Sequence, residues 1–197
     1  MRHPSLRLAL FAFFAVAFGF VVSAIPSPAD VGTFWVGNFS SPWAVIAFLT
    51  GWAQPSRPRA ALGGAVALVA CVLGFYSRFL FVDAARMGLP DTTPLSALAA
   101  AALLNWLVFA EPWLLLAVAA GGAYGLLGRW WGDSRAVLPG AALALAFIVE
   151  PAAWWLYRGF LQGPALIWAV EIALGLVVLG WVAITRSPRP GSSPQPS

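Results

Sequence analysis

Two glutamates, Glu150 and Glu171, stand in stretches of sequence that are otherwise as apolar as hydrocarbon. A charged side chain in a membrane interior costs roughly 2.5 to 3.5 kcal/mol on insertion scales, so it usually faces the bundle interior or a wet cavity and finds a partner. Two carboxyl groups at such a place can serve as acid and base, or form a proton or ligand site. Pro151 removes a backbone donor directly after Glu150, which predicts a kinked, hydrated turn there.

The inventory of side chains argues against an enzyme. The chain has one histidine, His3, and no lysine, so a serine nucleophile would lack its usual base. No set of His, Cys and carboxylate residues has the spacing of metal ligands. We therefore expect no catalytic residues, no metal and no cofactor.

The composition indicates a membrane protein. Apolar residues make up 61% of the chain and charged residues 9%, and the mean hydropathy is +0.84, well outside the values of soluble domains. The net charge of +4 comes with eleven basic residues, all arginine, scattered in ones and twos. This scatter does not form the basic patch that nucleic acid requires, so the expected partners are the lipid bilayer, a small solute or another membrane protein.

Apolar runs and their punctuation predict an all-α, polytopic transmembrane bundle of six helices in one domain, residues 1–185. The expected spans are residues 6–24, 32–53, 60–82, 111–130, 137–157 and 164–185. A further apolar stretch, residues 94–110, precedes the fourth span, and the Pro/Ser-rich residues 186–197 form a disordered cytoplasmic tail. The first run has features of a signal peptide, but its length favours a retained helix.

The arginines decide between six and seven crossings, because cytoplasmic loops carry the excess of positive charge. With one net crossing between residues 94 and 127, eight arginines lie inside and three outside, which favours six. The inner group is Arg2, Arg7, Arg57, Arg59, Arg129, Arg135, Arg186 and Arg189, and the outer group is Arg78, Arg86 and Arg158. This membrane topology predicts a bacterial plasma (inner) membrane protein with both termini cytoplasmic. Glu111 and Pro112 then open the fourth helix, and residues 94–110 become an outer or re-entrant segment.

In this threading Glu150 and Glu171 lie at the same depth, each about 10 Å below the outer end of its helix. Arg78 lies about one turn below the outer end of the third helix and is the nearest candidate partner. The three side chains are predicted to face a common polar region.

The second span contributes to the same region. Ser41 is a candidate cap and Pro42 suits a first helical position, while Asn38 and the glycines before it do not favour helix. A helix that starts here is only about 18 Å long and cannot cross the hydrocarbon layer. The segment is therefore either a full helix kinked at Pro42 or a broken helix with an irregular outer half, a recurrent device in transporters.

Two interpretations of this region stay open. In the first, Glu150, Glu171, Arg78, Asn38 and Ser41 bind a small solute in an outward-facing pocket. Trp154 and Trp168 then help to cage a cation. In the second, the charged groups form a structural network in a scaffold or accessory protein, and the tryptophans belong to the interfacial belt.

The sequence also resembles a known family. The residues that carry the likeness are Asn38 with Ser41-Pro42-Trp43, the run "GGAYGLLGRWW" (residues 121–131), Glu150, and Glu171-Ile-Ala-Leu-Gly175. They resemble a family of uncharacterised multi-pass membrane proteins common in actinobacteria. The resemblance covers most of residues 6–185, and it implies about six membrane helices and no activity. Glu150 is followed by proline where a glycine or small residue is expected.

Overall fold

The computed structural model describes residues 4–25, 39–84, 94–159, 161 and 164–185. In these ranges the chain is all-α, with six helices and no strand. The helices are α1 Pro4–Ala24, α2 Ser41–Trp52, α3 Arg57–Ala84, α4 Leu95–Ser134, α5 Val137–Arg158 and α6 Ala165–Thr185. The predicted tail and the predicted irregular segment at residues 26–38 lie outside the described residues.

Five of the six described helices are long and apolar enough to cross a membrane, and α2 is the exception. The sizes of the buried and exposed side chains also indicate a membrane protein. The buried residues of α4 are alanines, glycines and one tryptophan, while leucines, valines and phenylalanine cover its exposed faces. An outside of large apolar side chains around a core of small ones suits a lipid environment. The bundle is therefore that expected of an integral membrane protein.

The helices α2, α3 and α4 pack at backbone distance, and α1 packs against α3. A Cβ atom on Gly51 would lie 2.1 Å from the carbonyl oxygen of Gly125, and one on Gly125 would lie 2.2 Å from that of Ala60. Only glycine allows this approach, as in the small-residue interfaces of other membrane helices.

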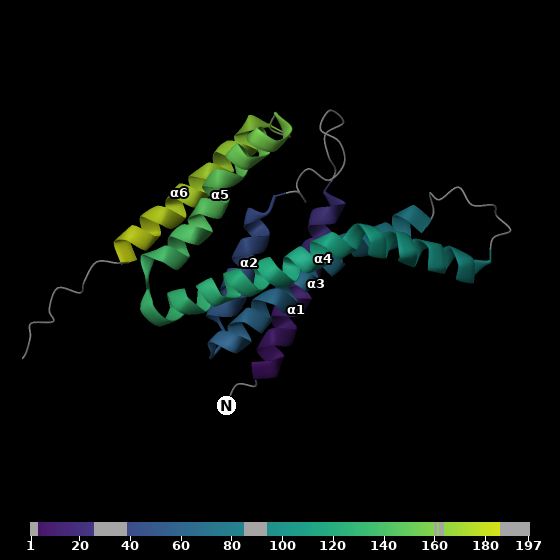
Figure 1. Ribbon diagram of the computed structural model, residues 1–197, viewed down its shortest axis with the longest axis horizontal. Helices are drawn as coiled ribbons and strands as arrows, with labels where there is room; N and C mark the ends of the chain where they lie inside the picture. The colour runs from purple at the N-terminus through teal and green to yellow at the C-terminus, as the bar shows by residue number, and fades with distance from the viewer. Residues whose placement is uncertain (1–3, 26–38, 85–93, 160, 162–163, 186–197) are drawn as a thin grey trace, which may run out of the picture.

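Helices α5 and α6 form a hairpin that packs mainly on itself, and Figure 1 shows the two helices side by side. The hairpin reaches the other helices through α2 and α4. A buried apolar cluster fills this contact, with Ala44 and Phe48 from α2, Trp131 from α4, Leu143 and Phe147 from α5, and Val182 from α6.

The helix α4 begins earlier and is longer than the sequence predicted. Residues 94–110 do not form a separate segment, and no helix starts at Glu111, because α4 runs without a break from Leu95 to Ser134 with Pro112 inside it. Its 40 residues span about 60 Å, twice the hydrocarbon thickness. Proline removes one hydrogen bond, while the alanines and leucines around it are strong helix formers. Figure 1 shows α4 bending along its length, and a proline is a usual cause of a bend.

The second span also differs in extent from the prediction of residues 32–53. In the described residues it is helical only from Ser41 to Trp52, and Phe39 and Ser40 are not helical. The helix start predicted by the Ser-Pro pattern is thus present. At 12 residues, α2 is about 18 Å long, too short to span the hydrocarbon layer.

Candidate functional site

The first turn of α2 meets a carboxylate from another helix. The Glu150 carboxylate on α5 accepts hydrogen bonds from the backbone N–H of Ser40 at 2.5 Å and of Ser41 at 2.9 Å. The N-cap residue is Ser40, whose own side chain makes no capping bond. The expectation that Ser41 caps this helix is therefore wrong. Glu150 satisfies two of the donors that a helix start leaves free, and its negative charge faces the positive end of the helix dipole.

Ser41 connects the second glutamate to the same turn. Its side chain is buried, and its Oγ donates a hydrogen bond to Oε1 of Glu171 on α6. The exposed fraction is 7% for Glu150 and 6% for Glu171. The structure thus brings together Glu150, Ser41 and Glu171, which the sequence predicted to face one polar region. We call the two glutamates the acid pair.

One oxygen of the acid pair has no hydrogen-bond partner in the part of the chain that the structure describes. The buried Oε2 atom of Glu171 has no hydrogen-bond donor among the residues that the structure describes. The Glu150 carboxyl lies close enough to the Glu171 carboxyl for the two groups to share a proton. Two carboxylates repel each other unless a proton or a cation lies between them. A proton or a cation between the two groups would remove this repulsion.

Pro151 does not break the helix that carries Glu150. Helix α5 runs continuously from Val137 to Arg158 with Pro151 inside it. The irregular backbone of the site belongs instead to Phe39 and Ser40, directly before α2.

An aromatic cluster lies close along the chain to the residues of the acid pair. The rings of Phe39 and Trp168 lie edge to face, with centroids 4.7 Å apart. Trp154 packs against this buried core. Trp168 precedes Glu171 by one helical turn and Trp154 follows Glu150 by one turn. Trp168 is buried, so its ring contacts other side chains of the protein and does not lie on the surface.

Two predicted members of the site fall outside the description. Asn38 lies outside the described residues. The backbone of Arg78 belongs to α3, but its side chain is not described. Among the described side chains, no arginine forms an ion pair with Glu150 or Glu171. The described residues also hold no cluster of three or more metal-ligating side chains.

Sequence reasoning missed two contributors to the site. Ser40 takes part through its backbone N–H, which no side-chain pattern reveals. Tyr124 of α4 interacts electrostatically with Glu150. It lies in the run "GGAYGLLG", which reads as a helix-packing motif, and its position as the single polar ring of that run was the available signal.

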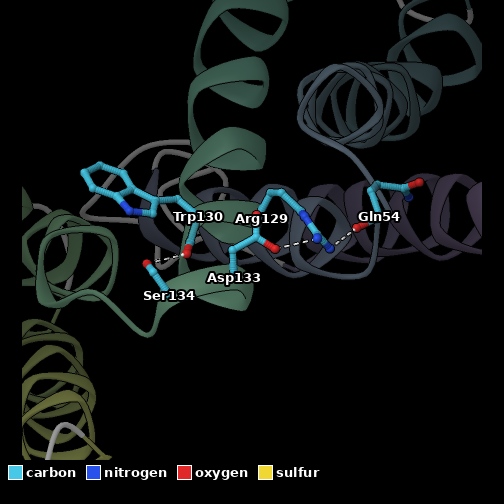
Figure 2. A network of polar contacts seen from close by, with 5 residues as sticks. All are labelled: Gln54, Arg129, Trp130, Asp133 and Ser134. Atoms are coloured by element: carbon cyan, nitrogen blue, oxygen red, sulfur yellow. Dashed lines mark hydrogen bonds and ion pairs between the residues drawn. The ribbon is translucent and has the colours of Figure 1, made fainter. Parts of the chain in front are cut away.

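A second polar network lies at the other end of α2 (Figure 2). Arg129 of α4 donates from Nη1 to the carbonyl oxygen of Gln54 at 2.7 Å and forms an ion pair with Asp133. The Arg135 guanidinium lies 5.6 Å from the ring centroids of both Trp52 and Trp131. The charges of Arg129, Asp133 and Arg135 are therefore paired or stacked, in contrast with the carboxyl groups of the acid pair.

Comparisons with protein-family models, with curated proteins and with solved structures gave no match. The resemblance to a multi-pass family of actinobacteria stays a prediction.

Proposed function

We propose that this chain is a membrane protein that binds, and as a transporter moves, a small cationic solute at the acid pair. The observation that carries the proposal is the buried Oε2 of Glu171, which has no donor among the described residues and lies near a second carboxyl group. A buried charge is normally paired. A cationic solute would supply the missing partner.

The surrounding groups support a cation over other solutes. The N–H groups of Ser40 and Ser41 are already used by Glu150, so they are not available to an anion. Phe39, Trp154 and Trp168 form one cluster, and the two tryptophans lie one helical turn along the chain from the acid pair. Aromatic faces attract ammonium groups. We propose an ammonium or a small alkylammonium ion as the class of solute.

The test is thermal unfolding of the purified protein in detergent with ammonium, methylammonium, tetramethylammonium or sodium chloride. A ligand that binds only the folded state stabilises it, by about 2.7 kcal/mol at 100 times its Kd. We expect a saturable rise in Tm for the wild type with at least one alkylammonium salt. The rise should be absent in Glu171→Gln, which keeps the shape of the side chain and removes its charge.

The matched control is Glu111→Gln, because Glu111 is an exposed glutamate of α4 far along the chain from the pair. It should respond to the salts as the wild type does. Two results would sink the proposal. One is a wild type whose Tm no cation raises. The other is an equal rise in Tm in Glu171→Gln, which would mean that the salts act by general screening of charges and not by binding at the acid pair.

A second candidate function is a scaffold or accessory protein whose acids are structural. It is favoured by the two hydrogen bonds through which Glu150 caps α2 without any ligand. In that case Glu150→Gln lowers the stability while no cation changes the Tm of the wild type.

For localisation we propose the bacterial plasma membrane with both termini cytoplasmic, on the arginine distribution. Because α2 alone is too short to cross the hydrocarbon layer, this topology requires residues outside α2 to complete the second crossing. Single cysteines replacing Arg57 and Arg158, in a chain with Cys71 changed to alanine, should be labelled from opposite sides of sealed vesicles. Labelling of both from one side would contradict this threading.

A further inference from the structure

Three arginines, Arg57, Arg129 and Arg135, lie near the junctions of α2 with α3 and of α4 with α5. They differ in whether another group of the protein interacts with their charge. Arg129 is held by Asp133 and by the Gln54 carbonyl, and Arg135 lies between two tryptophan rings. Arg57, the first residue of α3, is exposed and has no ion pair among the described residues. No acidic residue lies in the first turn of α3 to neutralise it.

Arg57 lines a groove of about 700 Å³ on the outside of the bundle. Its other lining residues are Ala123, Leu126, Leu127 and Trp130 of α4. Their spacing puts them on one face of the helix, over a length of about 10 Å. Four apolar side chains therefore form a track along α4, and the guanidinium group provides a positive charge in the same groove.

We infer that this groove binds an anionic phospholipid, with one acyl chain along α4 and the phosphate on Arg57. The charge complementarity supports this occupant, because an arginine offers paired donors to a phosphate and the rest of the lining suits a hydrocarbon chain. The first backbone N–H groups of α3 add a favourable field for an anion. Trp130, which is partly exposed, has the amphipathic ring typical of the boundary between headgroups and acyl chains.

The test is native mass spectrometry of the purified protein from mixed micelles with equal amounts of phosphatidylglycerol and phosphatidylcholine. The wild type should retain phosphatidylglycerol in preference. Arg57→Gln should reduce that retention about fivefold, the effect of one basic residue near an anionic surface. Arg59→Gln is the matched control, because Arg59 is exposed on the same turn but does not line the groove.

A second variant tests the apolar part of the groove. Ala123→Phe fills the track while leaving Arg57 in place, and Ala123 is exposed, so the fold should tolerate it. It should lower the retention of both lipids. Unfolding curves should show that all three variants are folded.

Several results would overturn the inference. Equal losses in Arg57→Gln and Arg59→Gln would mean a diffuse effect of surface charge. A wild type without preference for the anionic lipid would mean a contact with acyl chains alone. A dimer in the wild type that Ala123→Phe removes would assign the groove to a second copy of the chain.

Discussion

Helices α1 to α4 and the α5–α6 hairpin are held in the molecule by different means. In the first part, backbones approach at glycines such as Gly51 and Gly125, so the contact depends on the absence of side chains. The hairpin meets α2 through side chains, namely an apolar cluster and the hydrogen bonds of the acid pair. A backbone contact is insensitive to charge, whereas a contact through carboxylates responds to it. A cation at the acid pair would therefore act on the hairpin and not on the glycine contacts.

The largest effect is expected from Gly125→Leu. A Cβ atom at this position would lie 2.2 Å from the carbonyl oxygen of Ala60, which is backbone and cannot turn away. The helices must separate, and we expect a loss of about 3 kcal/mol or more in the free energy of unfolding. Titration with a denaturing detergent, followed by circular dichroism, measures this.

The control for this variant is Gly180→Leu in α6. Nothing lies within 4 Å of a Cβ atom there, so the change should be neutral or slightly stabilising, since glycine is a poor helix former. Similar losses in the two variants would contradict the view that close backbone approach at Gly125 holds α3 and α4 together.

The next effect is expected from Glu150→Ala, which acts on the contact between the hairpin and α2. It leaves the N–H groups of Ser40 and Ser41 without their acceptor, and Ser41 is buried. An unsatisfied buried donor costs about 1 to 3 kcal/mol, so we expect a loss of about 2 kcal/mol. Hydrogen exchange at the start of α2 should increase, while exchange in the α3–α4 contact should not.

The exposed Glu111→Ala serves as the control, and it should leave the exchange at the start of α2 unchanged. If Glu150→Ala instead increased exchange throughout α3 and α4, the two parts would unfold as one unit and the comparison would fail.

The similar distance of the two glutamates from the shared end of α5 and α6 was predictable from sequence, because helix rise converts residue counts into distance. Glu150 and Glu171 stand at similar distances from the shared end of their helices, and the structure joins both to Ser41. The all-α class of the fold and the bounds of α5 and α6 were also predictable, because each of these helices coincides with one apolar run of the sequence.

The partners of these residues were not predictable, because they depend on which helices are neighbours in space. Glu150 lies more than a hundred residues along the chain from Ser40, which it binds through the backbone. The continuity of α4 through Pro112 was missed for another reason. Local sequence rules treat a proline as a helix start, but they do not weigh its single lost hydrogen bond against 40 residues of apolar helix.

The smallest effect is expected from Asp133→Asn, in the polar network at the other end of α2. The ion pair with Arg129 is partly exposed, with side-chain exposures of 25% for Arg129 and 39% for Asp133. Exposed pairs contribute about 0 to 1 kcal/mol and are screened by salt. Arg129 also keeps its hydrogen bond to the Gln54 carbonyl in this variant. We expect a loss of about 0.5 kcal/mol in low salt that disappears in high salt. A loss that matches Glu150→Ala and resists salt would show that this end of α2 depends on charge as the acid pair does.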